Sequence, residues 1–266
     1  MDDRAANYNP LATADDGSCD LSCIKRHWAK NISDQESNNS NNSTNTIYAT
    51  EKDLIVMLKG TSASTVFMDT TTVSTPGQHT CFTLGSFNQD AEFNWALSPT
   101  NMVYYNSESH GVNVGSHYIS KEGNIYLHLW SELMGFNFGS KSVNFSDDYP
   151  RDFLCKINNS GSVEYLTYSH FSESGVTKLL EDTDKNLFIF SDQNGLYNVN
   201  YVIPNNSGFF QKLDSLGGVL FTYYFTPQTL TVGTYAVTII DMNLINNILY
   251  LTLQPNTTQL SLQYNE

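Results

Sequence analysis

A hairpin pattern near the middle of the chain reads Tyr118-Ile-Ser-Lys-Glu-Gly-Asn-Ile-Tyr-Leu127. Apolar and aromatic residues flank a polar turn with a glycine, which is typical of two antiparallel strands joined by a tight turn. Three other segments, Ile47–Met57, Lys178–Ile189 and Val237–Tyr250, have the same order of strand, acidic or Asn-rich turn and strand. The sequence therefore predicts one β-hairpin that recurs along most of the chain.

The recurrence has a nearly constant period. The turn residues Asp53, Asn124, Asn186 and Asn247 are 71, 62 and 61 residues apart. A second pattern, a strand that opens with Phe and a strand that opens with Val, recurs between these turns at separations of 60 and 56 residues. Two concordant periods predict repeated four-stranded antiparallel units. The copies of the second pattern are Phe93–Leu97 with Val103–Tyr105, Phe153–Ile157 with Val163–Tyr165, and Phe209–Leu213 with Val219–Phe221.

A single unit of this kind has apolar faces that it cannot cover alone, so neighbouring sheets are expected to stack face to face like propeller blades. Glycines in Asn158–Gly161 and Asp214–Gly218 suit the positive φ of tight hairpins. The predicted fold is all-β, a β-propeller-like stack of about four antiparallel blades over residues 46–266. The last blade has one more candidate strand, Gln259–Tyr264, and is either incomplete or closed by an N-terminal strand. A β-sandwich with recurrent hairpins is the alternative.

Composition narrows the class of protein. The chain has 266 residues, of which 40% are hydrophobic, enough for a substantial core. Its net charge of −14 and pI near 4.6 disfavour nucleic-acid binding through a basic patch, and suit cations and neutral partners such as sugars. Apolar runs are strand-sized, so no membrane insertion is expected.

Three parts are expected along the chain. Residues 1–23 form a compact acidic loop module, and residues 24–45 form an Asn/Ser-rich stretch too polar to fold alone, hence a flexible linker. Residues 46–266 form the β domain. The N-terminus has no secretory signal pattern, so export is handled elsewhere or a signal was removed.

The four cysteines favour structural roles. A local Cys19–Cys23 bridge, or bonds from these two residues to the body, is favoured over a metal site, because no second pair or histidine stands at ligand spacing. Cys81 and Cys155 lie in apolar strand-like stretches, where buried free thiols act as core residues.

No catalytic motif is present: the six histidines form no His-Glu-x-x-His pair, and there is no Gly-x-Ser-x-Gly elbow or phosphate loop. The chain is therefore expected not to be an enzyme. A propeller glycoside hydrolase with Asp147 or Asp148 and Asp182 as its two carboxylates is kept as an alternative. His128 and Trp130 share a strand face and could stack on a sugar, although packing in the core is favoured.

The repeats carry a further sequence likeness. The second unit contains Lys121-Glu-Gly-Asn-Ile-Tyr-Leu127, Gly139-Ser-Lys-Ser142, Arg151–Gly161 and Glu164–Tyr168. These segments resemble a bacterial surface β-propeller repeat family whose units read roughly D-x-x-G-N-I-Y, D-A-F-V-A-K-L-x-x-x-G and Y-S-T-Y. The resemblance implies secreted or surface-displayed proteins in which the repeat is a binding scaffold. The third unit matches through Lys185–Ile189 and Lys212–Gly217, and the first through Asp90-Ala91, Leu97 and Tyr104-Tyr105.

The N-terminal module reads Ala5-Ala-Asn-Tyr-Asn-Pro-Leu-Ala12, then Asp15-Asp-Gly-Ser-Cys19. It is similar to short modules related to thrombospondin type 3 calcium repeats, found in surface proteins of Bacteroidota and in structural proteins of aquatic phages and large viruses. Such modules have two cysteines before Asn-Tyr-Asn-Pro, whereas this chain has Ala6 there, so Cys19 lacks the partners that the resemblance implies and Cys23 is the candidate to replace them. Calcium prefers hard oxygen ligands, and an Asx-rich turn cluster is the alternative to a calcium site. The candidate ligands are Asp2, Asn7, Asn9, Asp15 and Asp16.

A second calcium candidate, Asp182-Thr-Asp-Lys-Asn186, has alternating oxygen ligands but no downstream Glu, so a hairpin turn is favoured. The functional prediction is a non-enzymatic structural or attachment protein on a virion surface, as a capsid decoration, tail or fibre component. Its partners would be other structural proteins of a larger assembly, with cell-surface glycan as a further ligand. The alternatives are a secreted bacterial cell-surface adhesion or cargo module and the propeller hydrolase.

Overall fold

The described chain consists of strands, with no helix among these residues. The computed structural model describes residues 32–34, 44–61, 65–68, 71–74, 81–104, 111–145, 151–169, 178–191, 208–227, 237–245, 248–255 and 260–265. Every pair of neighbouring strands runs antiparallel. The predicted all-β class and the four-stranded antiparallel sheets are confirmed.

Two sheets have four strands in order along the sheet. Each sheet combines a leading hairpin, its first two strands, with a trailing hairpin, its last two, and the second strand pairs with the third. Sheet 1 contains β2 (Thr44–Ala49), β3 (Asp53–Thr61), β6 (Cys81–Asn88) and β7 (Phe93–Leu97). Sheet 2 contains β9 (Val112–Ile119), β10 (Ile125–Ser131), β13 (Arg151–Ile157) and β14 (Val163–Ser169).

Sheet 3 has four strands in the same arrangement as sheets 1 and 2, and a fifth strand at its edge. The additional strand, β21 (Leu260–Asn265), pairs with β18, so the strand expected to extend the fourth unit belongs to sheet 3 instead. The fourth leading hairpin, β19 (Val237–Ile245) with β20 (Ile248–Pro255), forms a two-stranded sheet of its own. All four predicted leading hairpins are therefore present. The other strands of sheet 3 are β15 (Lys178–Glu181), β16 (Leu187–Ser191), β17 (Gly208–Leu213) and β18 (Val219–Pro227).

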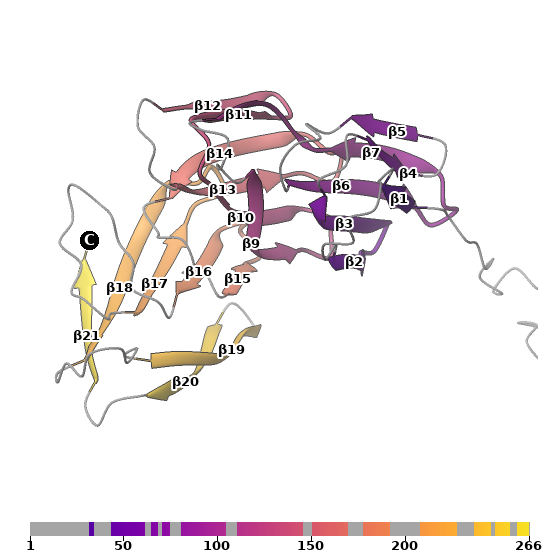
Figure 1. Cartoon of the computed structure of the whole chain (residues 1–266). Coiled ribbons are helices and arrows are strands. Elements are labelled where there is room, and N and C mark those ends of the chain that lie inside the picture. Colours follow the sequence, from indigo (N-terminus) through magenta and orange to yellow (C-terminus); the bar gives the residue numbers. More distant parts are fainter. Residues whose placement is uncertain are drawn as a thin grey trace, which may run out of the picture.

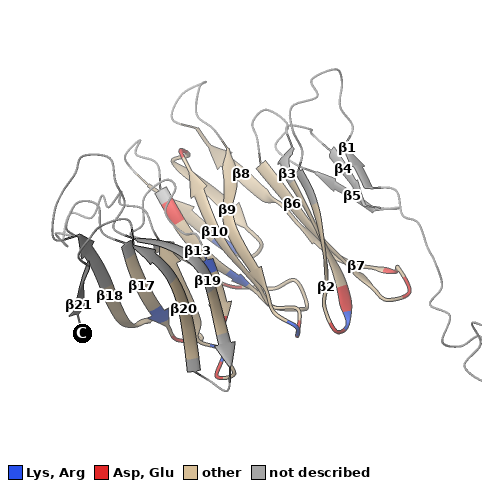
Figure 2. Ribbon diagram, turned by 90° about the horizontal axis from the view of Figure 1, so that it is seen from below, with Lys and Arg blue, Asp and Glu red and all other residues tan. Residues whose placement is uncertain are grey.

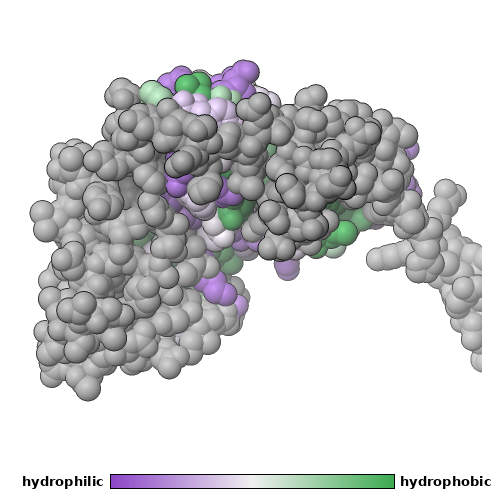
Figure 3. All heavy atoms as spheres, in the orientation of Figure 1, coloured by the Kyte–Doolittle hydropathy of each residue, from purple (hydrophilic) through white to green (hydrophobic). Residues whose placement is uncertain are grey.

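The sheets follow one another along the molecule in chain order (Figure 1) and lie face to face when seen from below (Figure 2). Because side chains alternate along a strand, each inner sheet supplies apolar residues to two interfaces. Among the residues that Figure 3 colours by hydropathy, the visible apolar ones form small separate areas beside hydrophilic ones. The interfaces are lined by Ile55, Met57, Phe82 and Leu84 against Leu127, Leu129, Phe153 and Ile157; by Tyr126 and Leu154 against Leu179, Leu187, Ile189 and Phe209; and by Phe188, Phe190 and Phe210 against Met242, Leu249 and Leu251.

Two small sheets are inserted beside this stack. One consists of β8 (Pro99–Val103), β11 (Gly135–Phe138) and β12 (Lys141–Asn144), and places Phe136 and Phe138 in the core shared by sheets 1 and 2. The other consists of β1 (Ile32–Asp34), β4 (Thr65–Met68) and β5 (Thr71–Ser74). In both sheets, a hairpin lies in sequence between the leading and trailing hairpins of a unit.

The expected pairing of Phe93–Leu97 with Val103–Tyr105 in the first unit was wrong. Phe93–Leu97 pairs with β6, whereas Val103 faces Gly135 in the inserted sheet. The first strand of this trailing hairpin is therefore β6, and Phe93 corresponds to Val163 rather than to Phe153. Thr83, Gly85 and Ser86 interrupt the apolar pattern of β6, although its first seven residues are all buried.

Strands also occur within the range expected as a linker. β1 pairs with β4 through Ile32–Asp34, and β2 begins at Thr44, just before the expected domain boundary. The head at residues 1–23 lies outside the described residues.

Candidate functional site

One five-residue turn recurs at the ends of the hairpins. In each copy, the first N–H donates to the fifth carbonyl and the fourth N–H donates to the first carbonyl. The first side chain accepts from backbone N–H groups: Asp214 Oδ1, for example, accepts from Leu216 at 2.9 Å and from Gly218 at 2.8 Å. The fourth residue has a positive φ in every copy. The copies are Asn88–Glu92, Ser120–Asn124, Asn158–Ser162, Asp182–Asn186 and Asp214–Gly218.

The trailing turns carry contacts from one unit to the next. The Trp95 ring of sheet 1 lies against Gly161 of sheet 2, where a Cβ would come within 2.6 Å of the ring. Trp95 Nε1 also donates to the Asn159 carbonyl at 3.1 Å. One unit further, the Tyr165 ring lies against Gly217, with 3.5 Å to the position of a Cβ. An aromatic side chain on the last strand of a unit thus packs on the turn glycine of the next unit.

A buried polar contact joins sheets 2 and 3. Glu181, on β15, accepts a short hydrogen bond from the Tyr126 hydroxyl and one from Asn124 Nδ2 at 3.3 Å. Burial and the bond to the Glu181 carboxylate raise the pKa of Tyr126, so it stays a neutral donor. At the rim of this contact, the Lys185 ammonium pairs with Glu122 and lies 4.0 Å from Glu181 Oε2. These groups bind one sheet to the next.

Two lysines hold similar structural positions on the middle strands. Lys156 is buried between sheets 2 and 3, where its Nζ lies 3.0 Å from Glu164 Oε2 and 5.6 Å from the Tyr126 ring centre. Lys212 Nζ lies 3.0 Å from Asp182 Oδ2. Burial raises the pKa of Asp182, but hydrogen bonds from Asn186 and Lys212 outweigh it, and the pKa falls below its ordinary value.

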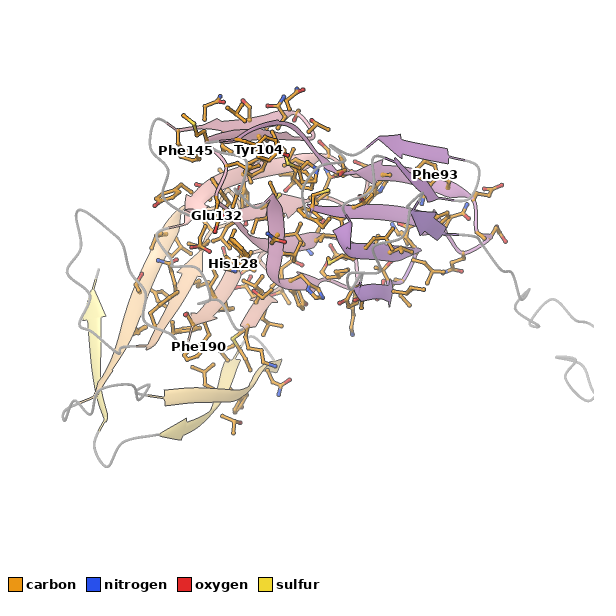
Figure 4. All side chains as sticks on the ribbon, in the orientation of Figure 1. Phe93, Tyr104, His128, Glu132, Phe145 and Phe190 are labelled. Carbon is orange, nitrogen blue, oxygen red and sulfur yellow. The ribbon has the colours of Figure 1, made fainter. Side chains whose placement is uncertain are left out.

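The histidine considered as a sugar contact belongs to the interior. His128 is 1% exposed, and its Nε2 lies 2.7 Å from Asp152 Oδ1 on the neighbouring strand. Figure 4 shows it within the sheets, with Phe190 on the side of β19 and β20. Its Nδ1 is buried without a partner among the described residues, close to Gly115. The prediction that His128 packs in the core is confirmed.

At the last described interface, sheet 3 packs against the two strands β19 and β20. A row of rings crosses sheet 3 on the side of β19 and β20, with centroids 5.6 Å apart for Phe188 and Phe210, 5.8 Å for Phe210 and Phe221, and 5.3 Å for Phe221 and Tyr223. Phe221 and Tyr223 are only partly buried. Among the described strands, β20 pairs with β19 alone. We call β20 and the two partly buried rings, Phe221 and Tyr223, the open end.

The sequence-predicted site residues are placed as follows. Asp2, Asn7, Asn9, Asp15, Asp16, Cys19 and Cys23 lie outside the described residues, as do Asp147 and Asp148. Asp182 caps its own turn, as expected, through Oδ1 to the N–H groups of Asp184 at 2.9 Å and Asn186 at 2.8 Å. Cys81 and Cys155 are buried thiols outside any disulfide, as predicted, and burial raises the pKa of Cys155.

The structure adds two negative findings for the residues it describes. No group of three or more His, Cys, Asp or Glu side chains there is arranged to hold a metal ion. Within the same ranges, no helix has the length and apolar character that crossing a membrane requires.

Sequence reasoning did not identify the open end. One sequence feature could have indicated it: an aromatic residue recurs seven residues after the first residue of each trailing turn, as Trp95, Tyr165 and Phe221. No family model matches the chain, and the searches of curated proteins and of solved structures likewise found no match.

Proposed function

We propose that this chain is a non-enzymatic structural protein that acts as a binding scaffold on the surface of a virus particle, as a capsid decoration, tail or fibre component. We further propose that its units are blades of a propeller-like stack. The observation that carries the proposal is the open end, where β20 has one edge without a partner strand among the described residues and two rings of sheet 3 are only partly buried.

The interior chemistry supports a structural role. Glu181, Asp182 and Lys156 pair with groups on neighbouring strands or on the next sheet. The Glu181 contact crosses from sheet 3 to sheet 2, whereas the ion pairs of Asp182 and Lys156 join strands of one sheet. Because a buried charge is costly without a partner, these contacts hold the strands and the two sheets in one arrangement. We therefore assign these charged groups a role in stabilising the scaffold.

The N-terminal residues would provide the attachment. In this proposal, residues 1–23 form a calcium-binding head with Asp2, Asn7, Asn9, Asp15 and Asp16 as ligands. Residues 24–45 tether the β domain to the particle. The acidic net charge disfavours a role on nucleic acid.

Immunogold labelling of purified particles tests this function. Antibodies raised against the full chain should label intact virions at regular surface positions. Labelling of bacterial cell surfaces, with none on particles, would instead support the adhesion module. Turnover of glycans by the purified chain would support the hydrolase and contradict the scaffold.

A further inference from the structure

We propose that the open end binds a β-hairpin of a partner protein, which takes the place of a trailing hairpin for the fourth unit. The proposal deepens the scaffold function and rests on it in one respect, that the chain has an assembly partner. What it adds is the chemistry of that partner and the surface that receives it.

Strand pairing within each unit follows one pattern. In sheets 1, 2 and 3, the second strand of the leading hairpin pairs with the first strand of the trailing hairpin, as β3 with β6, β10 with β13 and β16 with β17. β20 is the second strand of the fourth leading hairpin, and no third strand is paired with it among the described residues. Its backbone is therefore suited to addition of a strand from another protein.

Each of the first two units also contacts its successor in the same way. Trp95 packs on Gly161 and Tyr165 packs on Gly217, so the first two units each give a ring to the next turn glycine. Phe221 holds the same position in the third unit. Its described ring neighbours are Phe210 and Tyr223 of its own sheet. The receiving surface thus continues two interfaces already present in the molecule.

These contacts specify the partner. Its hairpin should have a turn that begins with Asn or Asp and has glycine as the fourth residue, as in Asn158–Ser162 and Asp214–Gly218. The strand before the turn should place apolar residues at alternate positions, as Phe153 and Ile157 do in sheet 2. Glycine suits that position because its φ is positive in both turns, and at Gly161 a Cβ would also come within 2.6 Å of the ring of the preceding unit.

A second copy of the chain fits this surface poorly. Antiparallel pairing of two β20 strands places the twofold axis perpendicular to the sheet, which keeps both third sheets on the same side. Each sheet 3 would then occupy the space below the partner's hairpin. A hairpin from a different protein has no such conflict.

The experiment uses the chain's own trailing hairpin as the probe. A fluorescent synthetic peptide of residues 151–169, with Cys155→Ser to prevent oxidation, is titrated with the full chain and followed by anisotropy. A matched peptide carries Gly161→Asn, because Asn tolerates a left-handed turn but adds a Cβ. Two variants of the chain are compared, Phe221→Ala and Leu220→Ala, the latter at a neighbouring residue that is 50% exposed.

Saturable binding is expected for the peptide that keeps Gly161. Gly161→Asn in the peptide and Phe221→Ala in the chain should each weaken binding about fivefold or more, and Leu220→Ala should leave it unchanged. Absence of saturable binding, or equal affinity of the two peptides, would overturn the proposal. Dimerisation of the chain that blocks the peptide would overturn the choice of partner. Particle labelling is measured separately, so the scaffold function and this docking surface can fail independently.

Discussion

Substitution of a turn glycine offers a direct test of the contacts between units. Gly161 and Gly217 occupy the same turn position in successive units, with φ of 80° and 88°. Their surroundings differ. A Cβ on Gly161 would lie 2.6 Å from the Trp95 ring, whereas a Cβ on Gly217 would lie 3.5 Å from the Tyr165 ring, an ordinary contact.

The difference sets the expected magnitudes. Gly161→Ala and Gly217→Ala both force an L-residue into a left-handed conformation, at a cost of about 1–2 kcal/mol. Only Gly161→Ala also pushes a methyl group into a packed ring, which adds about 1–3 kcal/mol. We therefore expect Gly161→Ala to lower the free energy of unfolding by about 2–5 kcal/mol, against about 1–2 kcal/mol for Gly217→Ala.

Urea titration of both variants measures this difference, with circular dichroism for the whole fold and tryptophan fluorescence for the surroundings of Trp95. The emission of native Gly161→Ala should change, and that of Gly217→Ala should match the wild type. Equal losses of stability in the two variants would refute the packing of Trp95 on Gly161. So would a Gly161→Ala protein as stable as the wild type.

Three further predictions concern other parts of the molecule. Tyr126→Phe removes a donor to the buried Glu181 carboxylate and should lower the free energy of unfolding, measured in urea, by about 1–3 kcal/mol. The control Tyr250→Phe, at a residue that is 51% exposed, should leave this free energy almost unchanged. Equal effects of the two substitutions would contradict the inter-sheet contact. The pKa of Asp182 is lower in the folded than in the unfolded chain, so its stabilising effect is complete above about pH 4 and is lost as the pH falls through the folded value. Asp182→Asn should flatten the acid limb of a plot of stability against pH, and an unchanged limb would count against this role. Chelation of calcium should lower the melting temperature of the head without unfolding the β domain, and identical melting curves would remove the calcium assignment.

The leading hairpins were predictable because their signal is local. Each has a polar turn between two apolar strands, and the turn residue recurs at nearly the same spacing. The trailing hairpin of the first unit was not, because small residues such as Gly85 in β6 weaken the pattern that Phe153–Ile157 shows clearly. The pairing of β21 with β18 depends on a contact between distant segments, for which the sequence has no local signal.

The interior contacts could be predicted only in part. Burial of Cys81 and Cys155 followed from their apolar surroundings, and the turn at Asp182 followed from the missing downstream Glu. The contact of Tyr126 with Glu181 could not be predicted, because 55 residues separate them and the stacking of two sheets brings them together. The same holds for Trp95 and Gly161, which meet only once sheet 1 lies on sheet 2.

Successive sheets stack face to face, and in sheets 2 and 3 the glycine of the trailing turn contacts a ring of the preceding unit. Proton NMR of a deuterated chain with protonated glycine and tryptophan tests it at the first interface. We predict a Gly161 α-proton signal displaced upfield by the Trp95 ring current, with a nuclear Overhauser effect between the two residues, and loss of both in Trp95→Leu. A Gly161 signal at its random-coil position, with no Overhauser effect to Trp95, would contradict the account.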